Sequence, residues 1–258
     1  MSAGTQAVAT SVAPAPAAVV AAVAAQAARP APGAPAAAPA APPAQTAPGS
    51  VAAVPAPALG ISRLLLVVTG AVAAAELPYW LGWLRSTYPA LELRIGVTAS
   101  AERFVSRVTL AGHSGAEVLP DRWAEDEVHA RHVLWTEWAE AVIVAPATLH
   151  FMARLALGLA DSPALLAAQC TTAPVVLLPA LPPGGLHSAA YRAHHAALAA
   201  RPNVAVLPPR PGLSMTTGRE DAWAPAPLPD ALAMVEQRRG ELAAAAVSAP
   251  LPPPASTL

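Results

Sequence analysis

Apolar residues in the middle of the chain occur as short continuous runs, separated by segments in which they recur with helical spacing. Five runs predict β-strands, at residues 61–68, 91–97, 141–145, 174–178 and 204–206. A short apolar run without polar alternation is typical of a strand that is buried on both faces of a sheet. The other segments favour helices at 73–86, 125–140, 150–159, 188–200 and 229–245, with another beginning over 101–106.

This order of elements predicts the fold class. Strands that alternate with helices form parallel sheets with right-handed crossovers. In the first predicted helix, one face collects Leu77, Trp80, Leu81 and Leu84, and we expect that face to pack on the sheet. The expected fold is α/β: a three-layer, Rossmann-like sandwich with a flavodoxin-type parallel sheet. In such open sheets, ligands bind at the carboxyl ends of the strands.

The two ends of the chain differ in composition from its middle. Residues 1–58 are almost entirely Ala, Pro, Val, Gly, Ser, Thr and Gln, with Arg29 as the one charged residue and no aromatic residue. Frequent prolines break both helices and strand ladders, so we expect a disordered tail there and a second one over 246–258. The stretch that remains, 59–245, has the length of one domain. The apolar run at 19–25 suggests a signal peptide as an alternative, but no basic region precedes it.

Charge and cysteine content narrow the function classes. The formal net charge is −1, so the chain lacks the basic footprint of a nucleic-acid-binding protein. Its apolar runs are too short and too rich in alanine to span a membrane. The single cysteine, Cys170, excludes a disulfide framework within the chain and fits a reducing, cytoplasmic location. Cys170 stands in an apolar stretch, where we expect it to pack in the core.

The turn after the first strand has the features of a phosphate site. It comprises Thr69, Gly70, Ala71 and Val72. Glycine lets a ligand approach the backbone, and the free N–H groups of the following helix start favour an anion. Many strand–glycine–helix turns bind nothing, and this alternative stays open. Thr98 and Ser100 follow the second strand and could donate hydroxyl hydrogen bonds to the same phosphate, although Ser100 could instead cap a helix.

A second candidate segment surrounds the third strand. The strand leads into Pro146, Ala147 and Thr148 at a helix start, where backbone amides and a hydroxyl could meet a ligand, and Thr148 could also be an N-cap. Upstream lies His132, whose neutral imidazole can accept a proton near neutral pH. The alternative is a surface histidine on a helix that also carries His129. A metal site is rejected because no third ligand follows at suitable spacing.

The segment from His132 to Asp161 resembles the homo-oligomeric flavin-containing cysteine decarboxylases. Their pattern reads roughly Pro-Ala-Ser/Thr-Ala-Asn-Thr, then Lys-Leu-Ala-Asn-Gly-Ile-Ala-Asp. This chain matches it at Pro146, Ala147, Thr148, Leu155, Ala156, Gly158, Ala160 and Asp161. It departs at His150 and Phe151, and Arg154 replaces the lysine. The family's Thr-Gly-Ser-Ile-Ala-Ala corresponds to the turn that begins at Thr69.

The resemblance implies a cofactor, a reaction and an assembly. FMN would bind at the turns around Gly70, Thr98, Ser100 and Pro146 to Thr148, and His132 would act as the proton acceptor. The implied reaction is oxidative decarboxylation of the C-terminal cysteine of a ribosomal precursor peptide. Its product is an aminoenethiol for S-aminovinyl-cysteine rings of the lanthipeptide or linaridin type. A homo-oligomer, either a trimer or a dodecamer, is implied as well, with flavin sites at subunit contacts.

The substrate segments depart from the family pattern. An asparagine that binds the substrate carboxylate in the family corresponds here to Pro182, so this task falls to an amide at Gly184 or Gly185, to His187 or to an arginine. The loop 212–219 resembles the family's substrate clamp and supplies Met215, Gly218 and Arg219 as candidate substrate contacts. The clamp has no cysteine, unlike that of the coenzyme A branch, so the product is expected to remain an enethiol.

Three other functions stay open on the resemblance. The first is phosphopantothenoylcysteine decarboxylation in coenzyme A synthesis, which is disfavoured by Pro182 and by the clamp without cysteine. The second is a flavin prenyltransferase, whose members normally lack a histidine at the spacing of His132. The third is a non-catalytic flavoprotein regulatory subunit that binds a partner enzyme.

Overall fold

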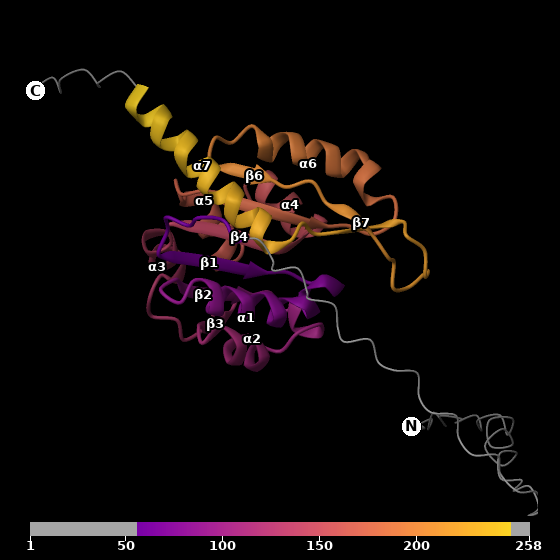
Figure 1. Cartoon of the computed structure of the whole chain (residues 1–258), viewed down its shortest axis with the longest axis horizontal. Helices are drawn as coiled ribbons and strands as arrows, with labels where there is room; N and C mark the ends of the chain where they lie inside the picture. Colours follow the sequence, from indigo (N-terminus) through magenta and orange to yellow (C-terminus); the bar gives the residue numbers. More distant parts are fainter. Residues whose placement is uncertain (1–55, 249–258) are drawn as a thin grey trace, which may run out of the picture. The chain divides into compact units, whose positions relative to one another are not determined.

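A parallel sheet forms the centre of the computed structural model, which describes residues 56–248. Of the tails expected at 1–58 and 246–258, residues 1–55 and 249–258 lie outside this range. The sheet comprises β1 (Arg63–Val68), β2 (Glu92–Val97), β3 (Glu117–Pro120), β4 (Ala141–Thr148), β5 (Val175–Ala180) and β6 (Val204–Val206). Its order is β3-β2-β1-β4-β5-β6, and Figure 1 shows β3, β2, β1 and β4 following one another in this order. The five expected strands are confirmed and follow the flavodoxin-type order, while β3 adds an unexpected edge strand.

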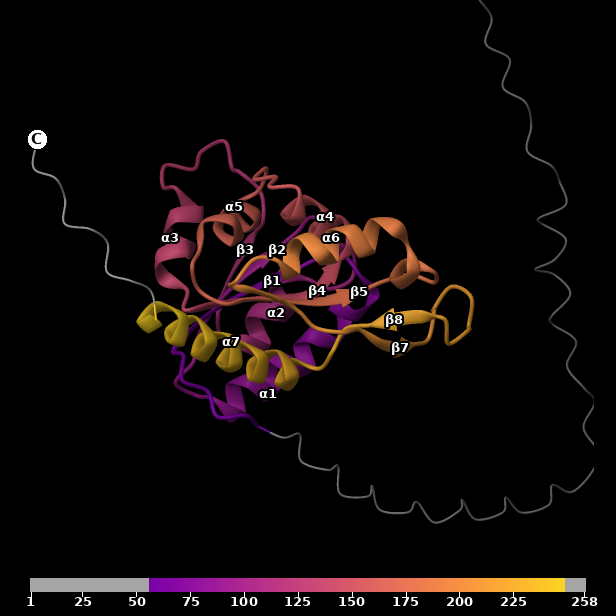
Figure 2. The same cartoon turned by 90° about the horizontal axis from the view of Figure 1, so that it is seen from above.

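Helices cover both faces of the sheet, so the predicted three-layer α/β fold is confirmed. One face carries α1 (Leu77–Thr87), α2 (Arg107–Ser114) and α7 (Leu228–Ser248). The other carries α3 (Arg131–Trp138), α4 (Leu149–Ala156), α5 (Pro163–Cys170) and α6 (Ala189–Ala199), as Figure 2 shows. In β1, alternate side chains enter the two cores: Leu64 and Leu66 face α1, and Leu65 and Val67 face the α3 side.

The helix that we expected at 125–140 is much shorter. It begins only at Arg131, because Glu127 accepts hydrogen bonds from the backbone N–H groups of Ala124 (3.4 Å) and Arg131 (3.2 Å) in the turn before it. His129 therefore precedes α3, and the expectation that two histidines share one helical face is wrong.

Other boundaries also differ from expectation. The segment 101–106 contributes only the short 3-10 helix η3 (Ala101–Arg103), and α2 begins after Ser106, whose hydroxyl accepts from the N–H of Thr109 at 3.1 Å. Helix α5 was not expected, although Ser162 as N-cap followed by Pro163 is a recognised start signal. At the end of the domain, α7 continues to Ser248, three residues past the expected boundary at 245.

A two-stranded hairpin projects beyond the carboxyl end of the sheet (Figure 2). It comprises β7 (Arg210–Gly212) and β8 (Ala222–Ala224), which pair antiparallel. Leu181, just after β5, and Trp223 exchange backbone hydrogen bonds of 2.9 and 3.0 Å. The loop that resembles a substrate clamp is therefore attached to the segment that follows β5.

The carboxyl ends of β1 and β4 mark the switch point of the sheet. The chain leaves β1 toward α1 on one face and leaves β4 toward α4 on the other. Such a divergence opens a crevice in which ligands bind in open α/β sheets. Among residues 56–248, no helix is both long enough and apolar enough to cross a membrane.

Candidate functional site

Thr69 ties together the two turns at the switch point. Its side chain is buried, and Oγ1 donates to the carbonyl of Pro146 at 2.6 Å. The same oxygen accepts from the backbone N–H of Thr148 at 3.0 Å. The end of β4 is thereby held against the end of β1. Thr148 is also the N-cap of α4, because its hydroxyl accepts from the N–H of Phe151 at 3.3 Å.

Gly70 lies directly against Ser100 from the next strand end. A Cβ at Gly70 would stand 2.5 Å from the Cβ and 2.8 Å from the carbonyl carbon of Ser100, so no larger residue fits without backbone movement. The hydroxyls of Ser100 and Thr98 are 3.2 Å apart. Thr98 accepts from the N–H of Ala101 at 3.3 Å, whereas Ser100 makes no capping bond. Ser100 is exposed, and its hydroxyl is hydrogen-bonded to that of Thr98 rather than used to cap a helix.

The start of the helical segment completes this cradle. Val72 opens the 3-10 helix η2 (Val72–Glu76), which continues into α1, while the N–H of Ala71 is turned back to the carbonyl of Thr69 at 3.0 Å. The first N–H groups of a helical segment have no partner within it and favour an anion. Backbone donors and two hydroxyls around a glycine fit the phosphate of a flavin mononucleotide.

His132 is positioned by the packing of α3 against the sheet. Trp135, three residues later, lies over Gly96 of β2, where an added Cβ would be 3.0 Å from the indole ring. Because α3 connects β3 to the parallel strand β4, the first turn of α3 stands at the carboxyl edge of the sheet. The Nδ1 atom of His132 is buried without a hydrogen-bond partner in the described range, and the ring meets Trp123 edge-on at 5.4 Å. Within the described residues, His132 makes no hydrogen bond to the turn at Thr69 or to the turn at Thr148.

Asp121, which our sequence reasoning missed, connects the elements around His132. It follows β3 and accepts from the N–H of Ala164 at 2.8 Å and from the hydroxyl of Ser162 at 2.9 Å. Burial raises the pKa of its carboxyl, while these hydrogen bonds and the charges of Arg154 and Arg131 act in the opposite direction. Asp121 thereby anchors α5, against which α3 packs. The start signal at Ser162 and Pro163 was the available sequence clue.

The expected substrate residues after β5 form a compact turn. The carbonyl of Pro182 accepts from the N–H of Gly185 at 2.9 Å, and Gly184 has a positive φ of 75°. The ring of His187 meets that of Trp223 edge-on at 6.0 Å, so the turn contacts the hairpin. The amide of Gly185 is therefore occupied, whereas the side chain of His187 faces the hairpin.

The expected clamp residues lie at the tip of the hairpin. Met215 is 72% exposed, and Gly218 has a φ of 69° where the loop turns. Arg219 is paired with Asp221 at 2.7 Å. The structure thus joins the base of this loop to the turn after β5 and leaves its tip open to solvent.

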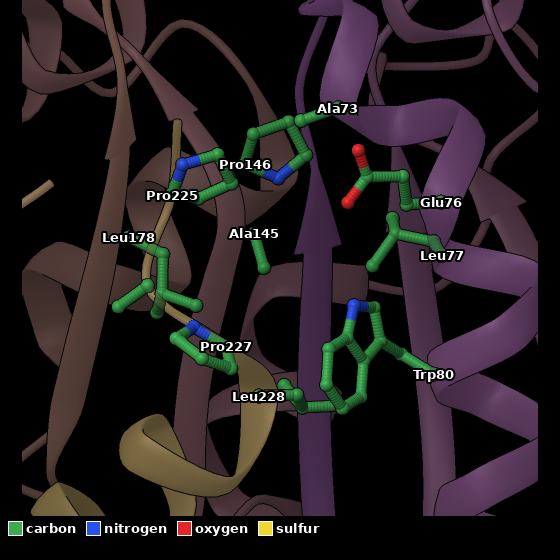
Figure 3. A pocket seen from close by; sticks show the side chains of 11 residues that line it. Ala73, Glu76, Leu77, Trp80, Ala145, Pro146, Leu178, Pro225, Pro227 and Leu228 are labelled. Carbon is green, nitrogen blue, oxygen red and sulfur yellow. The ribbon is translucent and has the colours of Figure 1, made fainter. Parts of the chain in front are cut away.

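A cavity of about 180 Å³ opens beside the switch point, on the α1 and α7 side of the sheet. Figure 3 shows Glu76, Leu77 and Trp80 on one side and Leu178, Pro225 and Pro227 on the other, with Ala145, Pro146 and Leu228 between them. Sequence reasoning placed Leu77 and Trp80 in the core but did not find the cavity, because its far wall follows β8.

The environment of Cys170 differs from the expectation. Cys170 is exposed at the end of α5, so the expectation that it packs in the core is wrong. It stands at the last position of the helix. In the described part of the chain, no group of three His, Cys, Asp or Glu side chains could hold a metal ion.

A parallel sheet with a phosphate-type turn at its switch point defines a class of α/β proteins that bind nucleotide-like cofactors. The chain belongs to the Flavoprotein family, whose family model matches residues 56–233. It is 35% identical over 181 residues to the cypemycin cysteine dehydrogenase (decarboxylating) of Streptomyces sp., covering 70% of this chain and 93% of that protein.

Two solved structures are similar to the fold. The crystal structure of the cypemycin decarboxylase CypD matches with a TM-score of 0.60 and 32% identity, covering 72% of this chain and 98% of that one. The FMN-dependent cysteine decarboxylase TvaF from thioviridamide biosynthesis matches with a TM-score of 0.57 and 26% identity, covering 70% and 99%.

Proposed function

We propose that this protein is an FMN-dependent enzyme that oxidatively decarboxylates the C-terminal cysteine of a ribosomal precursor peptide. The observation that carries the proposal is the joined pair of turns at the switch point, where Thr69 fixes the Pro146–Thr148 segment beside the Gly70–Ser100 cradle. The similarity to the cypemycin enzyme, whose name states a decarboxylating cysteine dehydrogenase, supports the choice of reaction.

The cofactor contacts divide into two groups. The amides of Gly70 and Val72 and the hydroxyls of Thr98 and Ser100 would hold the phosphate, around a turn that the hydrogen bond from the N–H of Ala71 to the carbonyl of Thr69 keeps in shape. Pro146, Ala147 and Thr148 would hold the ring, and their backbone is fixed by the buried hydroxyl of Thr69. FMN supplies the chemistry of a two-electron oxidant when bound.

The reaction balances as the loss of one CO2 and two hydrogens from the cysteine. Two electrons leave the Cα–Cβ–thiolate portion, and His132 accepts the proton that is released. The resulting thioaldehyde loses CO2 because the electron pair left on Cα delocalises into the C=S bond. The product is an aminoenethiol. The Nδ1 atom of His132 supports this role, since it is buried without a hydrogen-bond partner in the described range and no protein group there engages it.

The substrate carboxylate needs hydrogen-bond donors, and we look for them among the groups after β5 that have no partner within the protein. Pro182 offers no donor, the amide of Gly185 is used within the turn, and Arg219 is paired with Asp221. The amide of Gly184 and the side chain of His187 are the remaining donors beside the hairpin. They take the place of the asparagine that the family pattern has at Pro182, with Met215 and Gly218 contacting the peptide from the clamp.

The assembly is proposed to be a homo-oligomer, a trimer or a dodecamer, acting in the cytoplasm. Exposed apolar side chains near His132, namely Trp123, Val133 and Leu134, support self-association on this face. In such an assembly His132 serves a flavin at a subunit contact, which agrees with its lack of hydrogen bonds to the cofactor turns of its own chain.

The test uses the full-length protein and a synthetic peptide that ends in cysteine. Purified protein should be yellow from bound FMN, and mass spectrometry should detect a product lacking CO2 and two hydrogens. The same peptide ending in serine is the control and should be unchanged. Failure to bind FMN in titration would overturn the proposal. Turnover of phosphopantothenoylcysteine without turnover of any peptide would favour the coenzyme A branch instead.

A further inference from the structure

His132 lacks the contact that usually orients an imidazole acting as a base. When one ring nitrogen of a histidine takes part in chemistry, the other is normally held by a hydrogen bond to a carbonyl or carboxylate, which fixes the ring and its tautomer. In the described part of the chain, the Nδ1 atom of His132 is buried and has no such partner. The orientation of the ring must therefore come from the first turn of α3 and from Trp123, whose indole meets it edge-on at 5.4 Å.

Arg131, the residue before His132, connects these two supports. Its Nη1 atom donates to the carbonyl of Pro120 at 2.8 Å and to that of Arg122 at 3.4 Å, directly before Trp123 in the chain. The backbone of Arg131 belongs to the first turn of α3. One side chain thus ties the segment that carries Trp123 to the helical turn that carries His132.

Glu127 holds the guanidinium of Arg131 in place. Its Oε2 atom lies 3.0 Å from Nη2 of Arg131, and the two side chains are only 15% and 12% exposed. Every other ion pair among the described residues has a partner that is at least 41% exposed. Oε1 of Glu127 also accepts from the backbone N–H of Arg131 at 3.2 Å. Because water screens this pair least, its geometry is better defined than that of a surface ion pair.

The body of α3 has an anchor of its own. Trp135 is 1% exposed and packs over Gly96 of β2, where an added Cβ would be 3.0 Å from the indole ring. The helix is therefore seated on the sheet by a residue other than Arg131. What Arg131 adds is the link between the entry turn of the helix and the segment of Trp123, which are the two parts that surround the imidazole.

We propose that Arg131, held by Glu127, is a positioning residue that orients the imidazole of His132 for proton acceptance. The inference rests on the proposed function and deepens it, because it names the residues that fix the base. The side-chain contacts of Arg131 go to Glu127 and to the segment after β3, so its replacement should leave the cofactor turns intact. A displacement of about 1 Å at a reacting group can lower a rate roughly 100-fold.

The first experiment measures kcat and KM of the FMN-loaded protein with the peptide that ends in cysteine. Arg131→Gln should lower kcat roughly 10- to 100-fold and change KM less than about 3-fold, because the base is misplaced while the peptide contacts remain. Arg131→Lys should fall between wild type and Arg131→Gln, since an ammonium lacks the planar fork that reaches a carbonyl and a carboxylate together.

The matched control is Arg122→Gln in the same segment. Arg122 is exposed, and only its backbone carbonyl receives the hydrogen bond from Arg131. The kcat of this variant should therefore stay within about 2-fold of wild type, as for most surface substitutions.

A double-mutant cycle separates positioning from a merely structural role. His132→Asn leaves no base to orient, so adding Arg131→Gln to it should lower turnover no further. Losses that multiply in the double variant would overturn the proposal. So would a fall in kcat that comes with loss of FMN or with a changed oligomer mass in light scattering. If Arg131→Gln does not fold, Glu127→Gln replaces it in the same cycle and should give a smaller loss of kcat, because an oxygen acceptor is kept.

A labelling measurement tests the orientation of His132 without the reaction. Diethyl pyrocarbonate acylates imidazole nitrogens, and peptide mapping by mass spectrometry gives the rate at each histidine. Release of the ring in Arg131→Gln should raise the rate at His132 several-fold, while exposed His113 on α2 serves as the internal reference. An unchanged rate at His132 would overturn the positioning role. A raised rate in a protein that turns over no peptide would support the positioning role and contradict the proposed reaction alone.

Discussion

The hydroxyl of Thr69 donates a hydrogen bond of 2.6 Å to the carbonyl of Pro146, 77 residues further along the chain. Because the same oxygen accepts from the N–H of Thr148, one buried side chain aligns the ends of two parallel strands. This link places the phosphate cradle and the proposed ring contacts at a fixed separation, and it therefore couples folding of the switch point to cofactor binding.

Replacing Thr69 by Val should weaken both stability and flavin binding. The shape of the side chain is nearly kept, but the N–H of Thr148 loses its acceptor, which costs about 1–3 kcal/mol for a buried donor. Urea denaturation of the apoprotein measures the first effect and FMN titration the second. Thr69→Ser retains the hydroxyl and should stay much closer to wild type. Equal stability of the Val and wild-type proteins would contradict the role of this link.

Gly70→Ala should abolish or strongly weaken FMN binding. The added Cβ meets the backbone carbonyl carbon of Ser100 at 2.8 Å, so one of the two cradle turns must move. The control is Gly112→Ala on the exposed surface of α2, where nothing lies within 4 Å of the new Cβ. That variant should bind FMN normally and gain roughly 0.5–1 kcal/mol of stability. Titration followed by flavin fluorescence distinguishes the two.

His132→Asn should keep FMN and lose turnover. The cofactor contacts come from other segments, whereas removal of a general base lowers the rate by roughly two to four orders of magnitude. His129→Asn is the control, since His129 is exposed and precedes α3. Product formation is followed by mass spectrometry. Wild-type activity in His132→Asn would remove this residue from the mechanism, and joint loss of flavin and activity would make its role structural.

Asp121 should make the folded protein less stable as the pH rises above about 4, the usual range for an aspartate. Burial raises the pKa of this carboxyl in the folded state, so the folded protein binds the proton more tightly than the unfolded chain. The contribution of Asp121 to the free energy of unfolding is complete below the pKa of the unfolded state. It is lost as the pH rises through the pKa of the folded state. Denaturation across this range should show a weaker decline in Asp121→Asn.

Asp161 serves as a control, because its effect on the pH dependence of stability has the opposite sign. The hydrogen bond from Arg154 lowers the pKa of Asp161, so its contribution is present above the usual aspartate range and is lost as the pH falls through the lowered pKa. Asp161→Asn should therefore reduce the loss of stability on the acid side. If Asp121→Asn and Asp161→Asn changed the pH profile in the same direction, the account of Asp121 would be wrong.

Removal of residues 1–55 should leave FMN binding and the oligomeric state unchanged, because their composition offers few groups that could bury a core. The position of the cut matters. The hydroxyl of Tyr88 donates to the carbonyl of Pro57 at 2.6 Å, so a chain that begins at Leu59 should lose roughly 0.5–1.5 kcal/mol relative to one that begins at Ala56. Loss of soluble protein when the chain begins at Ala56 would show that the preceding segment is needed.

The sequence alone determined the features that depend on neighbours along the chain. Apolar runs predicted five of the six strands of the main sheet, since burial on both faces leaves a continuous local signal. The spacing of Leu77, Leu81 and Leu84 identified the buried face of α1 for the same reason. The turn at Thr69 and Gly70 was predicted because a glycine between a strand and a helix is a local requirement.

The tertiary structure decided what depends on distant partners. The short edge strand β3 exists because it pairs with β2. The hairpin is joined to the segment after β5 through Leu181 and Trp223, and this joining forms the far wall of the cavity. Each of these contacts links residues whose separate sequence signals are weak, because their energy arises only once the sheet has brought them together.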